Sequence, residues 1–366
     1  MIRTAAGLLL LFAAPAFGQG PLAPAGMPAP SMKTLAQVEP RTPITNAPFT
    51  ITQPGAYYLA ANLATTGHGV IVRADRVDLD LMGFAIAGDR GTGDYGVWLD
   101  GASNAPLRDI AVRNGILDHF DTGVRAEYAV NCRMENLLIS SNRISGIHLY
   151  AQGGSCLGNA IAGCSFSDTG DYGIYLNGGA AGQCNGNSIS DCTLGGDSYG
   201  IWIDGADSGQ GNGNLISGCT IGDTVLQGVY LHGNSSGQCN GNLISGCTIH
   251  DTGGYGIQLD GASGGRCEGN TIARCILFNN ADYGIALSYA NANRIERNHV
   301  TGTLNAGSVG IETENSSSNL IVQNSCVGQS SGYNIGLADT YGPVVTNTGS
   351  LSTNGSEAHP WANFSR

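Results

Sequence analysis

A short alternation of apolar and polar positions recurs along the middle of the chain. In Tyr199-Gly-Ile-Trp-Ile-Asp204, the isoleucines at 201 and 203 alternate with Trp202 and Asp204, as in a β-strand with one buried and one exposed face. Similar segments follow one another every 27 to 28 residues. The second residue of each segment is a glycine, which gives the column Gly173, Gly200, Gly228, Gly256 and Gly284.

A second segment repeats with the same period between these strands. It places an isoleucine between an asparagine and a cysteine in residues 187–192, 214–219, 242–247 and 270–275, so each repeat holds at least two strands. A fixed period is typical of a solenoid or a propeller, but propeller blades have about 40 residues and four strands. The pattern therefore predicts an all-β fold, a single-stranded parallel β-helix of about ten coils with N- and C-terminal caps.

The two ends of the chain differ from the repeats. Residues 1–18 combine one basic residue with an apolar run and small residues, which predicts a signal peptide. Residues 19–43 are rich in proline and are expected to form a linker. Residues 44–330 are expected to form the β-helix with its N-terminal cap, and residues 331–366, which lack the repeat, an irregular C-terminal cap.

The net charge of the chain limits the classes of molecule that the protein is expected to bind. The formal net charge of −12 excludes nucleic acid and an anionic membrane surface as favoured partners, because both would repel the protein. It also disfavours a polyanionic substrate unless Ca²⁺ mediates binding. We predict no cofactor, with Ca²⁺ as the metal ion that acidic stacks could bind. No stretch beyond the signal peptide is long and apolar enough for membrane insertion, and we expect a monomer.

Motifs near both ends resemble those of a known family. The chain contains Pro40-Arg-Thr-Pro-Ile44 and Gln53-Pro-Gly-Ala-Tyr-Tyr-Leu59 before the coils, and Tyr341-Gly-Pro343 and His359-Pro-Trp-Ala-Asn-Phe364 after them. With the coils, these motifs resemble a family of secreted bacterial right-handed parallel β-helix proteins of planctomycete type. The coils are also similar to the pectate-lyase-like superfamily, which includes polysaccharide lyases, glycoside hydrolases and mannuronan epimerases. The resemblance implies right-handed coils and a secreted, periplasmic or cell-surface location, but the Asp-Pro-His-Asp type of epimerase signature is absent.

Most of the 11 cysteines fall into two columns, and no CxxC pair suggests zinc. Cys164, Cys192, Cys219, Cys247 and Cys275 are expected to stack as buried free thiols. The second column is interrupted at Gly211. Equivalent Cα atoms in neighbouring coils lie about 4.8 Å apart, a distance that suits a disulfide in an exported protein. We therefore predict the disulfides Cys156–Cys184 and Cys239–Cys267.

The outward positions of the repeated strand form the candidate site. They are the second and fourth residues after each column glycine, and many are aromatic beside carboxylates and amides, as a sugar-binding surface requires. An alternative is that the aromatic residues stack only because cross-strand pairs stabilise a sheet. The predicted substrate-binding residues are Trp98, Asp100, Glu127, Tyr175, Asn177, Trp202, Asp204, Tyr230 and Asp260.

Four further residues of this face are candidate catalytic residues: Arg125, His148, Tyr150 and His232. A lyase or an epimerase needs a base, a group that neutralises the uronate carboxylate and often a tyrosine acid. The only lysine, Lys33, lies outside the coils, so a lysine base is excluded. A hydrolase would instead need two carboxylates, and Asp100 and Glu127 on neighbouring coils could approach the separation of roughly 5 Å that a retaining enzyme uses.

Three functions therefore remain open. The protein is a carbohydrate-active lyase, epimerase or hydrolase, a non-catalytic glycan-binding protein, or a structural, adhesin-like rod at the cell surface. For binding, the coil repeat of about 4.8 Å matches a hexose repeat of roughly 5 Å, so a sugar chain would run along the helix axis. Because the rings are expected on the outer face, their loss should weaken binding and hardly change stability.

Overall fold

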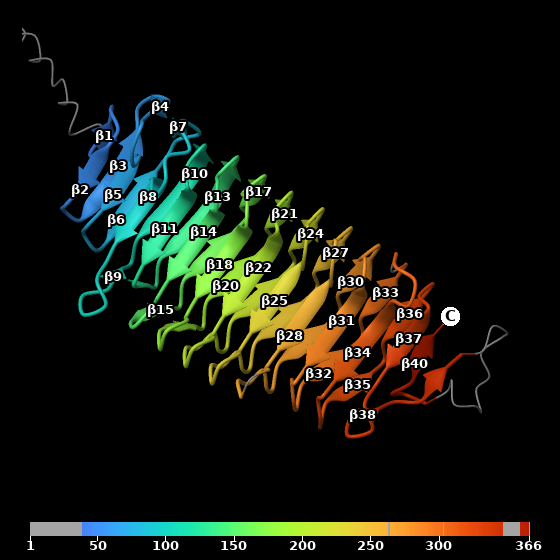
Figure 1. Ribbon diagram of the computed structural model, residues 1–366. Helices are drawn as coiled ribbons and strands as arrows, with labels where there is room; N and C mark the ends of the chain where they lie inside the picture. The colour runs from blue at the N-terminus through green and yellow to red at the C-terminus, as the bar shows by residue number, and fades with distance from the viewer. Residues whose placement is uncertain (1–38, 263, 303, 347–358, 366) are drawn as a thin grey trace, which may run out of the picture. The chain divides into compact units, whose positions relative to one another are not determined.

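The computed structural model describes residues 39–262, 264–302, 304–346 and 359–365, and the predicted signal peptide lies outside them. The residues from Arg41 onward form one compact unit. Within it, the chain winds into a parallel β-solenoid, and the described residues contain no helix (Figure 1). The prediction of an all-β parallel solenoid is confirmed.

The first sheet takes one strand from each coil and has 12 strands. All neighbouring strands are parallel. Apart from the strands at the two ends of the sheet, their number agrees with the predicted number of about ten coils, which is confirmed. The strands are β2 (Phe49–Ile51), β5 (Val70–Val72), β8 (Tyr95–Asp100), β11 (Thr122–Glu127), β14 (Ser145–Tyr150), β18 (Tyr172–Asn177), β22 (Tyr199–Asp204), β25 (Val229–His232), β28 (Ile257–Asp260), β31 (Tyr283–Ser288), β34 (Val309–Glu314) and β37 (Ser331–Asn334).

The second sheet has 24 strands, because most coils contribute two short strands that are separated by a bend. The eight-residue strands β10 and β13 run through the bend and join the two resulting ladders. The strands are β1 (Thr42–Ile44), β3 (Gly55–Leu59), β4 (Leu63–Ala64), β6 (Val77–Asp80), β7 (Ala85–Ala87), β10 (Ala111–Asp118), β13 (Arg133–Ser140), β16 (Ala160–Ala162), β17 (Ser165–Ser167), β20 (Ser188–Ser190), β21 (Thr193–Gly195), β23 (Leu215–Ser217), β24 (Thr220–Gly222), β26 (Leu243–Ser245), β27 (Thr248–His250), β29 (Thr271–Ala273), β30 (Ile276–Phe278), β32 (Arg294–Glu296), β33 (His299–Thr301), β35 (Leu320–Val322), β36 (Ser325–Val327), β38 (Thr340–Tyr341), β39 (Val344–Val345) and β40 (Asn363–Ser365).

A third, small sheet follows the turn after the first sheet. Its strands are β9 (Leu107–Arg108), β12 (Ala129–Val130), β15 (Ser155–Leu157) and β19 (Gln183–Asn185). Single bridges from Gln183 through Gln210 and Gln238 to Arg266 continue the same line across three more coils. The stacked turns of successive coils are thereby fixed by backbone hydrogen bonds.

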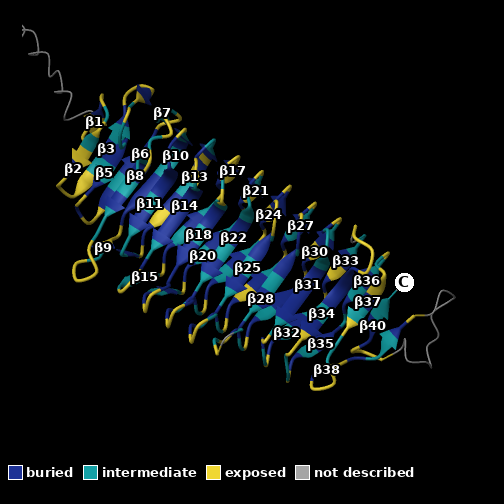
Figure 2. Ribbon diagram, viewed as in Figure 1, coloured by how far each residue is buried: buried dark blue, intermediate teal, exposed yellow. Residues whose placement is uncertain are grey.

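The core fills the space inside the coils, and the alternation in the sequence explains it. Ile201 and Ile203 are fully buried and pair in register with Ile174, Leu176, Val229 and Leu231 of the neighbouring coils. Figure 2 shows this pattern as buried strands whose connecting loops are intermediate or exposed. Aliphatic side chains stacked in this way supply the hydrophobic stabilisation that a single coil could not obtain alone.

The column glycines are required because the backbone approaches the core and the next coil closely. A methyl group on Gly200 would lie 2.5 Å from Ile221 Cγ2 and 2.6 Å from the carbonyl oxygen of Gly228. Both distances are shorter than any real carbon contact, so a larger residue would displace a coil.

The repeated asparagines form a buried ladder at one corner of the coils. Asn214 Oδ1 accepts hydrogen bonds from the backbone N–H of Asn187 at 2.8 Å and from its Nδ2 at 3.1 Å, and Asn242 does the same for Asn214. Several of the amides also donate to a backbone carbonyl, as Asn187 Nδ2 does to Cys156 and Asn214 Nδ2 does to Cys184. Buried polar groups of a turn are satisfied in this way without water.

The cysteines are buried, and all eleven are free thiols. The prediction for the column from Cys164 to Cys275 is confirmed. The predicted disulfides Cys156–Cys184 and Cys239–Cys267 are wrong, although Cys156 and Cys184 are direct neighbours in register. The coil spacing brings the thiols together, but complete burial in a satisfied core also suits two small apolar side chains that are not bonded.

Candidate functional site

The predicted site residues lie on the outer face of the 12-stranded sheet, in two rows that cross neighbouring strands from β8 to β28 (Figure 1). Residues within a row are paired in register between consecutive coils. The first row contains Trp98, Arg125, His148, Tyr175, Trp202 and Tyr230, and the second contains Asp100, Glu127, Tyr150, Asn177, Asp204, His232 and Asp260.

A third row, which the sequence reasoning missed, precedes the column glycines. Strict alternation would place these residues inside. The glycine interrupts the alternation, because a side chain on Gly200 would point at core atoms and the side chain of the next residue, Ile201, is also buried in the core. The residue before the glycine therefore shares the face of Trp202. The recurring Tyr-Gly pair was the available signal. The row contains Tyr95, Tyr172, Tyr199, Gln227, Tyr255 and Tyr283.

The first and third rows, together with His232 of the second row, meet in a continuous group of rings, here called the aromatic strip. It consists of His148, Tyr172, Tyr175, Tyr199, Trp202, Tyr230 and His232. Centroids of neighbouring rings are 4.5 Å apart for Tyr172 and Tyr175, 4.6 Å for Tyr199 and Trp202, and 5.1 Å for Trp202 and Tyr230. These are the distances of attractive aromatic pairs.

Apart from His148, which is buried, the rings of the strip are half-buried by one another. Trp202 packs against Tyr199 on its own coil, against Tyr175 on the preceding coil and against Tyr230 on the next. Rings in such contact contribute to stability as well as to any binding. The packing therefore leads us to expect that loss of the Trp202 ring also lowers stability, in contrast to the expectation from the sequence.

Hydrogen bonds connect the strip to two carboxylates of the second row. The Tyr175 hydroxyl donates to Asp204 Oδ2 at 2.9 Å, and the Tyr230 hydroxyl donates to Asp260 Oδ2 at 3.0 Å. His232 Nδ1 lies 3.2 Å from Asp204 Oδ1. Burial and the Asp204 charge raise the pKa of Tyr175. Burial opposes ionisation of Asp204, but hydrogen bonds from His232, the backbone N–H of Ala206 and Tyr175 hold its pKa below the usual value. Asp204 is therefore an ionised acceptor that orients two rings.

Arg125 organises the next part of the face toward the N-terminus. Its Nη1 lies 2.7 Å from His148 Nδ1, its Nε donates to Glu127 Oε1 at 3.1 Å, and its guanidinium lies 4.0 Å from the Tyr150 ring centroid. Burial, and secondarily the Arg125 charge, lower the pKa of His148 well below its ordinary value. His148 is therefore neutral, and its Nδ1 accepts the arginine hydrogen bond.

Two predicted site residues are not on the solvated surface. His148 is 7% exposed because Arg125 and the Tyr175 ring cover it, and Asn177 is equally buried, with Oδ1 accepting from the backbone N–H of Gly179. Both lie on the outer face of the sheet, as predicted, but neighbouring groups shield them from solvent. In the structure, Asn177 fixes a turn, and His148 supports Arg125 and Tyr175.

The carboxylates expected for a retaining hydrolase are neighbours, but both are bound to arginine. Asp100 Oδ2 lies 2.6 Å from Arg73 Nε, and Glu127 Oε1 lies 3.1 Å from Arg125 Nε. A hydrolase needs one carboxylate on each side of the scissile bond. Since each of these carboxylates is engaged by an arginine, neither is free to contact a sugar in this arrangement.

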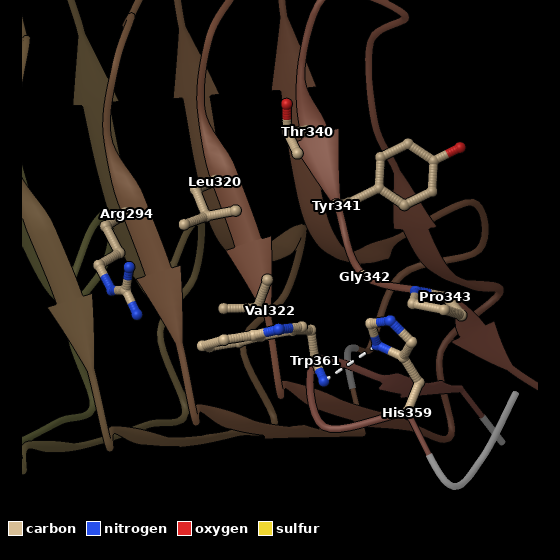
Figure 3. Close-up of a pocket in the computed structure, with 9 residues that line it drawn as sticks. All are labelled: Arg294, Leu320, Val322, Thr340, Tyr341, Gly342, Pro343, His359 and Trp361. Carbon is tan, nitrogen blue, oxygen red and sulfur yellow. Dashed lines mark hydrogen bonds between the residues drawn. The ribbon is translucent and has the colours of Figure 1, made fainter.

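A separate hollow lies at the C-terminal end of the second sheet, away from the predicted residues. It has a volume of about 360 Å³ and lies between β32, β35 and the segment with His359 and Trp361 (Figure 3). The Trp361 ring lies flat beside Val322, and Arg294 reaches toward it from β32. The hollow shares no residue with the aromatic strip.

Within the part of the chain that the structure describes, no three or more His, Cys, Asp or Glu side chains are placed to hold a metal ion together. Over the same residues, no helix has the length and apolar character that a membrane span requires.

Comparison with known proteins agrees with the architecture. Residues 68–209, 122–300 and 182–356 match the family described as a right handed beta helix region. The chain therefore belongs to the right-handed β-helix family. No curated protein sequence matches the chain significantly.

Several solved structures share the fold at low sequence identity. The Dettilon tailspike protein has a TM-score of 0.61 and 14% identity over 85% of this chain, which spans 62% of the tailspike. The A-module of the mannuronan C-5 epimerase AlgE6 from Azotobacter vinelandii has a TM-score of 0.60 and 16% identity over 78% of this chain and 89% of its own. The catalytic domain of a GH87 α-1,3-glucanase has a TM-score of 0.56 and 12% identity over 81% of this chain and 62% of its own.

Proposed function

We propose that this protein binds a polysaccharide through its aromatic strip. The observation that carries the proposal is the run of ring side chains across β14, β18, β22 and β25 with the carboxylates of Asp204 and Asp260 beside it. Rings pack against the apolar faces of sugars, and carboxylates accept hydrogen bonds from sugar hydroxyls. A sugar chain along the helix axis would meet a new ring at each coil, about 4.8 Å apart.

The fold relatives support this class of ligand. The glucanase structure was determined with tetrasaccharides, and the tailspike of bacteriophage HK620, with a TM-score of 0.55, with a pentasaccharide. The epimerase is named for mannuronan, also a polysaccharide. At identities of 12 to 16% these proteins share the fold, so the ligand of this chain rests on its own side chains.

Polysaccharide processing is the second candidate, supported by the row Asp204, His232 and Asp260. The two carboxylates lie two strands apart, or roughly 9.5 Å, near the upper limit for an inverting hydrolase. For a lyase or an epimerase, Arg125, His148, Tyr150 and His232 remain the proposed catalytic groups. A structural rod remains the outcome if neither binding nor turnover occurs.

Affinity electrophoresis against a panel of soluble polysaccharides tests the proposal. Trp202→Ala should weaken binding about five- to ten-fold, since a stacking ring contributes about 1 kcal/mol or more. The matched control is Tyr289→Ala, an exposed aromatic residue outside the strip. Equal losses in the two variants, or no retardation of the wild type by any polysaccharide, would contradict the proposal. Reducing-sugar and unsaturated-uronate assays on the same panel distinguish processing from binding.

The proposal also covers where the protein is located, whether it uses a metal ion and whether it acts as a monomer. The resemblance to secreted bacterial β-helix proteins supports export to the periplasm, the cell surface or the medium, and we propose binding by a monomer without a metal cofactor. Fractionation of the native host, binding in the presence of EDTA, and light scattering test the three points. Loss of binding in EDTA would assign a role to Ca²⁺.

A further inference from the structure

The outer face changes its charge along the helix axis. In the N-terminal part, carboxylates are balanced, since Asp100 pairs with Arg73 and Glu127 with Arg125. In the C-terminal part, the strands β25, β28, β31 and β34 contain no lysine or arginine but three carboxylates, Asp260, Glu312 and Glu314. The face therefore carries unbalanced negative charge beyond the aromatic strip.

A hollow lies at the edge of this negative region, where the third row of the face ends. The Tyr255 and Tyr283 rings, with centroids 5.2 Å apart, border a volume of about 280 Å³ together with Asp282, Asn305 and residues 306–308. Pockets for drug-sized ligands have volumes of about 300 Å³ or more. The hollow is slightly smaller, so its size suits a single sugar ring. It continues the row of Tyr172 and Tyr199 toward the C-terminus.

One carboxylate, Asp282, lines this hollow, and Glu312 lies on the neighbouring strand β34, beside β31. Asp282 Oδ1 accepts a hydrogen bond from Asn305 Nδ2 at 2.8 Å, and Glu312 Oε1 accepts one from Asn334 Nδ2 at 2.7 Å. Among the described residues, no ion pair involves Asp282, Glu312 or Asp260. Their partners are neutral donors, which orient the carboxylates and leave their charge in place.

We propose that this hollow binds a sugar ring that carries a protonated amino group, and that the ligand of the face is a glucosamine-containing polysaccharide. The inference rests on the proposed function and names its substrate class. The tyrosine rings would cover the apolar face of the sugar, and Asp282 would accept a charge-assisted hydrogen bond from the ammonium group. A polyuronate would meet repulsion along the same strands.

Titration of the full chain with four hexasaccharides of equal length tests the inference: oligomers of glucosamine, N-acetylglucosamine, glucose and a uronate, all in EDTA. The glucosamine hexamer should bind about ten-fold more tightly than the acetylated one, because one charge-assisted hydrogen bond is gained. The difference should shrink at high salt and at a pH that deprotonates the amine. The uronate should not bind.

Asp282→Asn and Glu312→Gln locate the effect. Each should lower affinity for the glucosamine hexamer several-fold and affinity for the glucose hexamer clearly less, because only the amino sugar loses a charge-assisted hydrogen bond. Asp223→Asn, at an exposed carboxylate directly after β24 on the second sheet, should change neither. Equal affinity for charged and neutral hexamers, or binding of the uronate, would overturn the amino-sugar inference and leave polysaccharide binding intact. If no sugar binds, both proposals fail.

Discussion

Asp197 is a buried carboxyl whose protonation should affect the stability of the protein. Its Oδ1 accepts hydrogen bonds from the backbone N–H of Thr169 at 2.7 Å and from Thr169 Oγ1 at 2.6 Å, and Oδ2 has no partner among the described residues. Burial raises its pKa from 3.8 to about 6, against the opposing effect of the Thr169 hydrogen bonds. The folded protein therefore favours the protonated form of this group more than the unfolded chain does.

The raised pKa gives a pH dependence with a definite sign. The stabilising contribution of Asp197 is fully present below its unfolded value of 3.8 and is lost as the pH rises through about 6. The loss amounts to about 3 kcal/mol. Asp197→Asn should thus be more stable than the wild type at pH 7, with the difference falling between pH 6 and pH 4. Urea denaturation of both proteins at each pH measures this.

Another coil indicates that the asparagine variant will fold. Asn280 occupies the corresponding position three coils along and accepts from the hydroxyl and the N–H of Thr252, as Asp197 does from Thr169. A stability difference that does not vary with pH would contradict the assignment of the titration to Asp197.

Trp202 allows the structural and binding roles of the strip to be separated. Because its ring packs against several neighbours and is half-buried, Trp202→Ala should lower the free energy of unfolding by about 2 kcal/mol. Tyr289→Ala, at an exposed position, should change it by less than about 0.5 kcal/mol. Chemical denaturation measures both variants. An unchanged midpoint for Trp202→Ala would mean that the rings are not packed as described.

At the scale of the strand, the column glycine controls how closely coils stack. Gly200→Ala introduces a methyl group 2.5 Å from Ile221 Cγ2 and 2.6 Å from a backbone oxygen of the next coil. We expect a loss of roughly 3 kcal/mol or more, since overpacking against backbone cannot relax locally. Gly67→Ala is the matched control, because its methyl group would have one neighbour at 4.0 Å. Similar melting temperatures for the two variants would contradict this account.

The same glycine explains what the sequence could and could not predict about the strands. Alternation correctly assigned Ile201 and Ile203 to the core and Trp202 and Asp204 to the outer face. It left out Tyr199, which lies on the outer face because two consecutive residues, Gly200 and Ile201, face inward. A period of two holds only where the strand has no irregularity, and here the recurring Tyr-Gly pair is the only sequence feature that marks the irregularity.

At the scale of the whole molecule, the fold was predictable because each coil repeats the last. A signal repeated at a constant period is stronger than any single strand, and one architecture satisfies it. The environment of His148 was not predictable in this way. It depends on Arg125 and Tyr175, which occur once each, so no other coil repeats the arrangement. The repeated residues therefore predict the architecture, whereas the environment of His148 depends on residues that do not repeat.

The asparagine ladder has a consequence for how such a chain can evolve. Asn214 and Asn242, 28 residues apart, hold the same place in successive coils, and each donates its backbone N–H and its Nδ2 to the Oδ1 of the next asparagine. A recombination event that joined one to the other would remove or duplicate a whole coil and preserve this ladder of hydrogen bonds at the junction. The length of the outer face can thus change during evolution in steps of one coil. If that face binds a sugar chain, a lineage could adjust the number of sugar units it measures without redesigning its core.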